Sequence, residues 1–418
     1  MSEISRISKA ASGIESDRRG FLKGAAAATV GGALGLSIPL RDELSIGALA
    51  QDVKPLPEYV KWKDPAAMIV HSEQTIETKR GYTASIITPE ETLYVRNNVK
   101  APDESFVADR NAWQVEITGV KSPKTLTVAE LKTMGLATVA MVLQCSGNGR
   151  SYFQEKVKGT DKKVSGTPWT VGAAGCVIWT GVPLKTVVEA LGGVAEGAKF
   201  ITGTGGEKIP EGVEAKDVMV ERSVPVGNLD NVILAWDLNG KPVSLAHGGP
   251  LRMIVPGYSG VNNVKYVKKV ALAAAESDAK IQKSNYRLHA LGEKASPDQP
   301  AVWEMDVKSW ITSPLLDGKA GRVQITGVAF GGMNAVASVE VSVDGGETWN
   351  KAEFVGPDLG RFAWRQFALS AEIKPGSYTL VSRATDSTGK AQPKDLEPNG
   401  SGYSHNGWLA PGFKVTLA

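Results

Sequence analysis

The stretch Val142-Leu-Gln-Cys145-Ser-Gly-Asn-Gly-Arg150 decides the fold, because it places a single thiol between an apolar run and a glycine-rich turn. Residues 138–143 are apolar and favour β structure, which predicts a buried strand. The four residues after Cys145 tolerate turn and left-handed backbone angles, so they end that strand. Cys145 is therefore expected where a strand becomes a loop, and functional sites are usually built at such places.

The chemistry of Cys145 alone leaves two interpretations open. Arg150 follows five residues later. A nearby cation lowers the pKa of a thiol, and a thiolate is a soft ligand that takes a metal. Alternatively, Cys145 is a small buried hydrophobe or one half of a disulfide with Cys176. Cys176 lies in the apolar run 172–184 and is predicted to belong to the core.

Length and composition narrow the class of protein. A chain of 418 residues is long enough for two or three domains with substantial cores. Its formal net charge of +3 argues against a general nucleic-acid surface, which needs a clustered basic excess. Two cysteines are too few for a disulfide scaffold. The composition therefore fits a globular protein without a nucleic-acid partner.

Residues 1–50 have the pattern of a twin-arginine export signal. Arg18 and Arg19 precede Phe21 and Leu22, and a weakly apolar stretch rich in Ala and Gly follows over residues 24–40. That stretch is too short and too mild for a stable membrane span. Ala48-Leu-Ala50 then fits a cleavage site. We therefore expect a mature protein that begins near Gln51, is exported folded and is located in a bacterial periplasm.

The segment Leu143-Gln-Cys145-Ser-Gly-Asn-Gly-Arg150 resembles the molybdenum-ligating segment of the sulfite oxidase family. The resemblance covers nearly all of the chain after the export signal. It implies that the Cys145 sulfur binds molybdenum carried by one molybdopterin per chain. It also implies an α+β architecture, with a mixed α/β molybdopterin-binding catalytic domain over residues 51–295 and an immunoglobulin-like domain over residues 296–418 that forms a homodimer.

Two further segments resemble cofactor-binding parts of that family. Residues 91–98 read as an apolar strand with polar residues at its end, and Asn98 stands where the family has a histidine. Residues 245–265 resemble a family segment that holds the pterin and its phosphate. A phosphate favours the planar fork of arginine, the charge of lysine and the N–H groups of a glycine turn. The cofactor-binding residues implied by the resemblance are Tyr94, Val95, Arg96, Asn97, Asn98, Cys145, His247, Arg252, Asn263, Val264 and Lys265.

The resemblance also implies residues that contact the substrate. Arg96 and Arg150 match family arginines, and Tyr286 matches a family tyrosine that lies over the metal. The eukaryotic branch of the family supplies another substrate arginine near the C-terminus, where this chain has Ser401. Arg287 and His405 are the candidates to replace it. The predicted catalytic residues are Arg96, Arg150, Tyr286, Arg287 and His405.

Local patterns predict further elements. Thr127 and Glu130 are spaced as a capping box at the start of a helix, and residues 184–191 predict an amphipathic helix with Pro183 in its first turn. From about Trp303, short alternating strands are separated by turn signals such as Asp344-Gly-Gly. This texture predicts an immunoglobulin-like β-sandwich.

The motifs that are missing bear on electron transfer. The sequence contains no Cys-x-x-Cys-His haem motif and no G-x-G-x-x-G turn after a strand. These absences imply that electrons leave to a separate protein. Together with the resemblance to the sulfite oxidase family, they lead us to expect a haem-free sulfite dehydrogenase that oxidises sulfite to sulfate and passes electrons to a c-type cytochrome. One alternative is the molybdenum subunit of a sulfur-oxidising multienzyme complex. Another is a non-catalytic exported binding protein whose sandwich is the working part.

Overall fold

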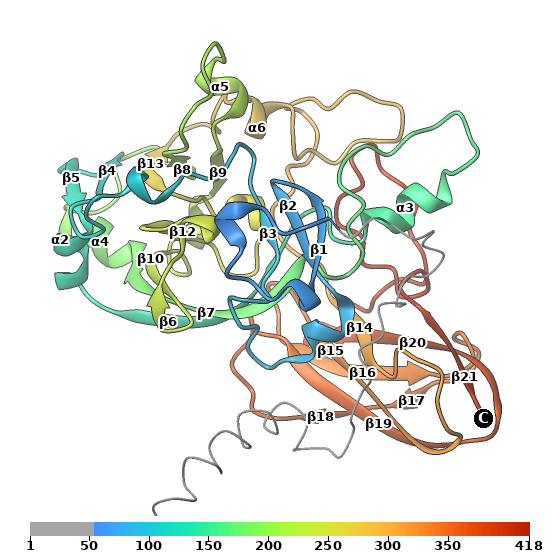
Figure 1. The fold of residues 1–418 in the computed structure, drawn as a ribbon. Helices are drawn as coiled ribbons and strands as arrows, with labels where there is room; N and C mark the ends of the chain where they lie inside the picture. The colour runs from blue at the N-terminus through green and yellow to red at the C-terminus, as the bar shows by residue number, and fades with distance from the viewer. Residues whose placement is uncertain (1–53) are drawn as a thin grey trace, which may run out of the picture. The chain divides into compact units, whose positions relative to one another are not determined.

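The antiparallel pair of strands β6 (Ala137–Gln144) and β7 (Ala174–Pro183) carries the cysteine loop in the computed structural model, which describes residues 54–418 (Figure 1). The two strands pair without a break from Ala137 opposite Gly181 to Gln144 opposite Ala174. The strand predicted over residues 138–143 is thus confirmed, and Cys145 follows it directly. The predicted export signal lies outside the described residues.

Three further antiparallel strands extend this pair. Strand β10 is buried along most of its length, as its apolar sequence Ile-Leu-Ala-Trp-Asp-Leu indicates. The order across the sheet is β11-β10-β7-β6, and β12 also pairs with β10. The added strands are β10 (Ile233–Leu238), β11 (Lys241–Pro242) and β12 (Arg252–Ile254).

A second sheet has the order β5-β4-β13-β8-β9, in which only β4 and β13 run parallel among its described pairs. Its strands are β4 (Gln114–Thr118), β5 (Lys124–Thr127), β8 (Phe200–Gly205), β9 (Glu221–Pro225) and β13 (Val267–Ala273). One hydrophobic core joins this sheet to helices α2 (Val128–Thr133) and α4 (Leu184–Ala190). The capping box is confirmed, since Thr127 and Glu130 bond each other's main-chain N–H groups at the start of α2.

Two local expectations are corrected. Pro183 is not in the first turn of α4 but precedes it, with φ −59° and ψ 130°, because it still pairs with Ile233 in the sheet. The strand predicted over residues 91–98 is only β3 (Val95–Arg96). The residues before it form turns, with Leu93 N–H bonded to Glu90 O at 3.3 Å. Strand β3 completes a small sheet with β1 (Met68–Ser72) and β2 (Thr75–Thr78).

The C-terminal part is an immunoglobulin-like sandwich of two four-stranded sheets, with orders β14-β15-β19-β18 and β17-β16-β20-β21. Apolar side chains from both sheets form one core. The strands are β14 (Lys308–Ser313), β15 (Gly321–Phe330), β16 (Val336–Ser342), β17 (Asn350–Lys351), β18 (Glu353–Val355), β19 (Arg365–Ile373), β20 (Gly376–Asp386) and β21 (Phe413–Leu417). The predicted α+β architecture is therefore confirmed, whereas the boundary between residues 295 and 296 stays a prediction.

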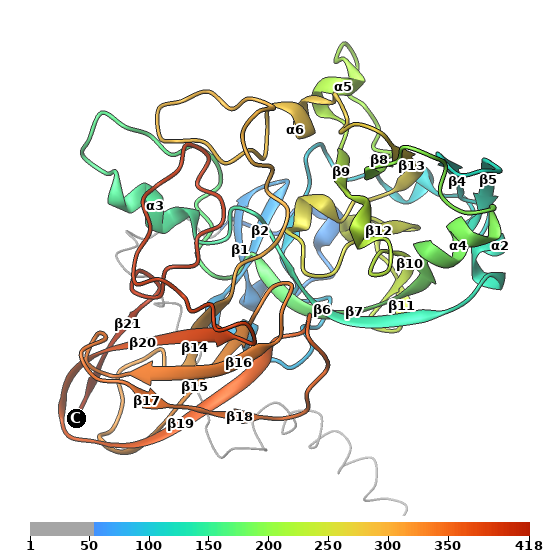
Figure 2. The same ribbon diagram turned by 180° about the vertical axis from the view of Figure 1, so that it is seen from behind.

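Residues 387–412, between β20 and β21, form a C-terminal strap that runs from the sandwich to the cysteine loop and back to the sandwich. Figures 1 and 2 both show it beside helix α3 (Arg150–Lys156). Lys156 of α3 forms an ion pair with Asp395 at 2.7 Å. The Ser404 N–H donates to Ser146 O at 3.0 Å. The strap therefore brings residues of the C-terminal part to the loop that carries the thiol.

The remaining helices within residues 54–418 are short. They are α5 (Ala215–Val218), α6 (Lys280–Lys283) and the 3-10 helices η1 (Glu58–Val60), η2 (Pro65–Ala67), η3 (Arg80–Ala84), η4 (Glu104–Phe106), η5 (Val226–Asn228), η6 (Leu245–His247) and η7 (Gly260–Asn262). Within residues 54–418, no helix has the length and apolarity needed to cross a bilayer.

Strand β2 lies very close to the segment before β7, and this allows a prediction about the free energy of unfolding. A Cβ added at Gly172 would lie 1.7 Å from Thr78 O, so Gly172→Ala must push the two segments apart. We expect the substitution to lower the free energy of unfolding by about 1–3 kcal/mol, as overpacking does. Gly227→Ala is the control, since no atom lies within 4 Å of its added Cβ. Melting temperatures of the two variants check this, and equal values would contradict it.

Candidate functional site

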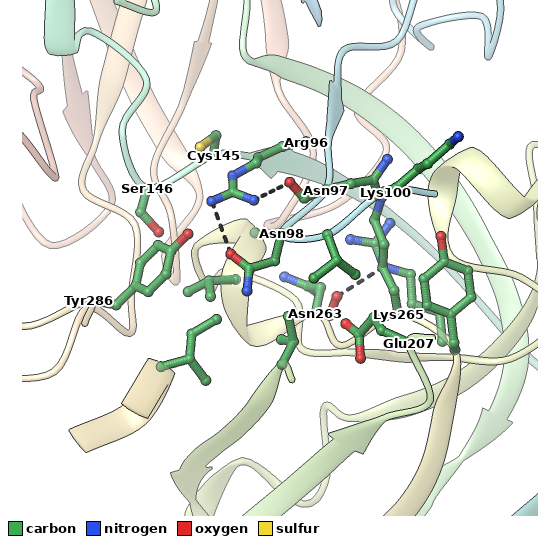
Figure 3. Close-up of a pocket in the computed structure, with 17 residues that line it drawn as sticks. Arg96, Asn97, Asn98, Lys100, Cys145, Ser146, Glu207, Asn263, Lys265 and Tyr286 are labelled. Carbon is green, nitrogen blue, oxygen red and sulfur yellow. Dashed lines mark hydrogen bonds between the residues drawn. The ribbon is translucent and has the colours of Figure 1, made fainter. Parts of the chain in front are cut away.

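A cavity with about 640 Å³ of empty space, counting its open mouth, lies beside the cysteine loop. Figure 3 shows Cys145, Ser146, Arg96 and Tyr286 toward one end and Lys265 with Glu207 toward the other. The predicted residues that line it are Arg96, Asn97, Asn98, Cys145, Arg252, Asn263, Lys265 and Tyr286. Tyr94, Val95, His247 and Val264 are buried, and none of them is among the residues that line the cavity. The structure thus gathers most of the predicted site from segments far apart in the sequence.

Hydrogen bonds hold the cysteine loop rigidly at the end of β6. The Cys145 N–H donates to Ala173 O at 2.9 Å, which continues the pairing of β6 with β7. Asn148 Nδ2 donates to Gln144 Oε1 at 2.9 Å, and Asn148 Oδ1 accepts from the Ala173 N–H at 3.1 Å. Gly149 has φ +95°, and a Cβ there would lie 2.9 Å from His405 Cβ. Glycine is required at this position by both its backbone angle and the strap that packs on it.

The two cysteines are both free thiols, which excludes the disulfide alternative. Cys176 pairs with Val142 in the β6–β7 ladder and belongs to a different core cluster from Cys145. Burial raises the pKa of Cys176 to about 12, as expected for an inert packing residue. Cys145 lines the cavity, so it is the thiol available to a ligand there.

Buried positive charge dominates the far end of the cavity. Lys265 Nζ donates to Asn97 Oδ1 at 2.5 Å and to Ala246 O at 2.6 Å. Burial, with further contributions from Arg252 and Arg96, holds the pKa of Lys265 well below its ordinary value. Glu207 also lines the cavity, but burial raises its pKa to about 7, so this carboxyl is only partly ionised near neutral pH and cancels part of this charge. A protonated Lys265 is stable here only with an anion beside it.

Arg252 and His247 are fixed behind this end. Arg252 Nη1 donates to His247 O at 2.8 Å, and its Nε donates to Asn263 O at 3.0 Å. The guanidinium carbon lies 5.1 Å from the Trp179 ring centroid. Burial lowers the pKa of Arg252 to about 10, which leaves it charged at neutral pH. Arg252 is therefore a fixed cation that lines the same cavity as Lys265 and contributes to the lowered pKa of that lysine.

Lys63 was not identified from the sequence, where it is one of several lysines in a polar stretch. Its Nζ donates to Leu93 O at 2.7 Å and lies 3.1 Å from His247 Nε2. Burial lowers the pKa of Lys63 to about 7. Burial and the neighbouring charge of Lys63 hold the pKa of His247 well below its ordinary value, so the imidazole is neutral at pH 7. Lys63 therefore orients His247, with Nε2 as the acceptor when the lysine is protonated.

The end near the thiol is shaped by Arg96. Its guanidinium donates to Asn97 O and, at 3.5 Å, to Asn98 Oδ1. Asn98 Nδ2 in turn donates to Val218 O at 2.5 Å. Favourable electrostatics with Tyr286 raise the pKa of Arg96 above its ordinary value. Asn98 thus supports Arg96 through a neutral amide at the position where the family has a histidine.

Three predicted catalytic residues lie outside this cavity. Arg150 donates to Ser401 O and Thr167 O, each at 2.9 Å. Arg287 forms a buried ion pair with Glu276 and donates to Gln282 O at 2.8 Å. His405 lines a second, smaller cavity, and burial lowers its pKa to about 3. Their roles toward a substrate stay predictions; in the structure none of the three lines the main cavity.

The second cavity contains a buried lysine that sequence analysis did not identify. Lys308 is 1% exposed, and its Nζ donates to Asn148 O at 3.1 Å. Burial lowers the pKa of Lys308 to about 7. Ser146 lines both cavities, and its Oγ has no hydrogen-bond partner among residues 54–418. Lys308 therefore braces the cysteine loop from the side of the sandwich.

The donor set of the main cavity fits a molybdenum–molybdopterin cofactor. Cys145 supplies a soft sulfur ligand at one end, and Lys265 with Arg252 supplies fixed positive charge for a phosphate. The Nδ2 of Asn97 is buried and has no partner in the described part of the chain, which leaves a donor free for a bound group. The sulfur ligand, the cations and the free amide donor therefore all fit this cofactor.

Comparisons with known proteins agree with this fit. Residues 101–281 match the family model described as oxidoreductase molybdopterin binding domain, and residues 299–416 match the Mo-co oxidoreductase dimerisation domain. Mitochondrial sulfite oxidase of Mus musculus is 29% identical over 88% of this chain and 70% of that protein. The nitrate reductase [NAD(P)H] of Hordeum vulgare is 33% identical over 77% of this chain, which spans only 38% of that protein.

A solved structure is also similar. The crystal structure of the sulfane dehydrogenase SoxCD from Paracoccus pantotrophus matches with a TM-score of 0.67 and 26% identity. The match covers 82% of this chain and 86% of that one. The similarity therefore extends over both the cavity-bearing part and the sandwich.

The burial of Lys308 predicts how the stability of the protein depends on pH. Its pKa is lowered from 10.5 to about 7, so between these values the unfolded chain binds one more proton than the folded one. Stability therefore rises with pH across this window, by about 1.4 kcal/mol per pH unit for one full proton. Lys308→Met should reduce the slope of the native protein by this amount, whereas Lys374→Met, at an exposed lysine, should leave it unchanged. Melting temperatures from pH 7.5 to about 9.5 check this, and parallel curves for Lys308→Met and the native protein would contradict it.

Proposed function

Because this chain belongs to the sulfite oxidase family of molybdoenzymes, we propose that it oxidises sulfite to sulfate at a molybdenum–molybdopterin centre. The observation that carries the proposal is the single cavity that joins the Cys145 sulfur to Arg96, Tyr286 and Lys265. A thiolate, a fixed cation and a phenol at one end suit a metal and a small anionic substrate. Cations at the other end suit a phosphate.

The residues have separate tasks in this proposal. Cys145 would hold the metal, while Lys265 and Arg252 would hold the phosphate. His247 lies behind them and accepts from Arg252 Nη1 through its carbonyl, so it would position Arg252. When bound, the cofactor supplies two-electron redox chemistry that a protein side chain cannot. Sulfite and one water become sulfate, with two electrons passed to an acceptor and two protons to solvent. The chain's own residues bind the anion, orient it and hold the metal ligand.

Arg96 and Tyr286 are the groups that bind the anion. Arg96 is charged at all physiological pH, and its guanidinium is held by Asn97 O and Asn98 Oδ1. A pre-oriented cation in a partly desolvated cavity attracts a doubly charged anion more strongly than one in water. The Tyr286 hydroxyl adds a donor beside it. Together they would bind the anion at the end of the cavity that contains Cys145.

A second candidate function is the oxidation of protein-bound sulfur. It is favoured by the match to the sulfane dehydrogenase SoxCD, which spans most of both chains. Nitrate reduction receives less support, because the chain spans little more than a third of the barley enzyme. Turnover of free sulfite against turnover of a carrier protein with a bound sulfane sulfur separates the first two functions.

Export, electron acceptor and oligomeric state complete the proposal. The twin-arginine pattern of residues 1–50 supports export of the folded, cofactor-loaded protein to a periplasm. A c-type cytochrome is the proposed acceptor there, through a small transient interface. The match of residues 299–416 to a dimerisation domain supports a homodimer.

Replacing the proposed metal ligand gives the most direct test. Cys145→Ser should lose molybdenum and sulfite oxidation, and the loss should exceed the roughly 10- to 100-fold effect of residues that only orient a ligand. Cys176→Ser is the matched control and should keep most of both, because Cys176 only packs. Elemental analysis and steady-state turnover measure the outcome. Full activity in Cys145→Ser would refute the assignment, and equal losses in both variants would point to a joint role for the thiols.

The acceptor is tested with purified protein and no other enzyme. We expect no haem absorption, and we expect sulfite to drive reduction of an added c-type cytochrome. Haem covalently bound to the chain, or reduction of NAD in place of the cytochrome, would end this part of the proposal. A native mass of one chain in solution would likewise contradict the homodimer.

A further inference from the structure

Four side chains form a continuous stack beside the cavity, in the order Arg222, Tyr286, Tyr403 and Arg150. The Arg222 guanidinium carbon lies 5.6 Å from the Tyr286 ring centroid. The rings of Tyr286 and Tyr403 are stacked, with centroids 5.0 Å apart and planes inclined by 12°. The Arg150 guanidinium carbon lies 5.4 Å from the Tyr403 ring centroid. Each cation faces a ring within the distance at which the two attract.

The first cation of the stack is rigidly held. Arg222, on β9, is 0% exposed, and its Nε and Nη2 both donate to Asn262 Oδ1, at 3.2 and 3.1 Å. Its Nη1 donates to Ile281 O at 2.8 Å. Burial lowers the pKa of Arg222 to about 10, so it is charged at neutral pH. Arg222 is thus a fixed cation that faces the ring of Tyr286.

Tyr286 has an unusual backbone. Its φ is +46°, a left-handed conformation that a bulky residue seldom adopts unless its surroundings impose it. Its carbonyl accepts from the Val302 N–H at 2.9 Å, which fixes the main chain. The rings and cations of the stack fix the side chain. Figure 3 shows the hydroxyl of Tyr286 directed into the cavity.

Tyr403 enters the stack from the C-terminal strap. Its N–H donates to Asn399 Oδ1 at 3.0 Å, and its carbonyl accepts from Asn399 Nδ2 at 2.8 Å. The next residue, Ser404, has φ +57° and bonds the cysteine loop through Ser146 O. The strap is thus shaped to insert the Tyr403 ring between Tyr286 and Arg150. This same strap has Ser401 where eukaryotic relatives in the family carry an arginine.

We propose that Tyr403 is a positioning residue that keeps the Tyr286 hydroxyl directed at the substrate, as the inner layer of the stack between two buried arginines. Tyr403 does not itself line the cavity and contacts no substrate. Its ring stacks on the ring of Tyr286, which lines the cavity. It also faces the guanidinium of Arg150, which donates to Ser401 O. The inference rests on the proposed function, since it assigns how the anion pocket of that reaction is kept in shape.

Loss of the Tyr403 ring and loss of its hydroxyl alone should have different effects, so two variants separate the role of the ring from that of the hydroxyl. Tyr403→Phe keeps a ring between Tyr286 and Arg150 and should retain at least about half of the native kcat/KM. Tyr403→Leu removes the ring, and Tyr286 then loses its neighbour on one face. We expect the KM for sulfite to rise about fivefold to tenfold, with kcat changed about threefold at most. The control is Tyr378→Leu, which removes a tyrosine of β20 in the sandwich and should leave KM unchanged.

A second readout does not need turnover. Sulfate binding to the oxidised, cofactor-loaded enzyme, measured by calorimetry, should weaken in Tyr403→Leu by the same factor as KM rises. It should stay near the native value in Tyr403→Phe. Molybdenum content should be equal in all three proteins, since the stack lies outside the cofactor-holding residues.

Three results would overturn the proposal. Equal losses in Tyr403→Phe and Tyr403→Leu would show that the hydroxyl acts and the ring does not. A lower melting temperature for Tyr403→Leu with native KM and native sulfate binding would show that the ring only packs. A fall in kcat without a change in KM would show that the stack acts on another step. If the native enzyme did not oxidise sulfite at all, the proposed function would fail first, while sulfate calorimetry would still decide the role of Tyr403.

Discussion

The hydrogen bond from the Cys145 N–H to Ala173 O, 2.9 Å long, is the contact on which the rest of the site depends. It extends the β6–β7 ladder by one pair and fixes the thiol at the point where the strand becomes a loop. Asn148 repeats the same link by bridging Gln144 and the Ala173 N–H. Because a buried strand pair is among the stiffest parts of a protein, the thiol is held in place before any ligand arrives.

Around this fixed thiol the structure concentrates positive charge that its own carboxylates do not balance. Burial lowers the pKa values of Lys63 and Lys265 and raises the pKa of Glu207 to about 7, so Glu207 is only partly ionised near neutral pH. Such a group of cations is costly in the bare protein and becomes favourable when an anion occupies it. The energetics of the site thus favour an anionic ligand, which agrees with the match of residues 101–281 to a molybdopterin binding domain.

The site also joins the two parts of the chain. The C-terminal strap bonds the cysteine loop through Ser404 and supplies Tyr403, while Lys308 on β14 bonds Asn148 from the other side. The main chain of the strap also holds Arg150, because Arg150 Nε donates to Ser401 O. The sandwich is therefore part of the site as well as the expected dimerisation domain.

The sequence by itself determined the features that arise from neighbouring residues. These are the strand before Cys145, the turn after it, the capping box at Thr127 and the strands of the sandwich. It did not determine the length of β3 or the place of Pro183, because turns and sheet pairing override local propensity there. Only the tertiary structure decided which charges meet, because Lys63 bonds His247 across 184 residues, Lys308 bonds Asn148 across 160 and Arg150 bonds Ser401 across 251. Long-range packing therefore decided the partners of the arginines. Arg150 and Arg287 bond carbonyl and carboxylate groups of the protein, whereas Arg96 lines the cavity.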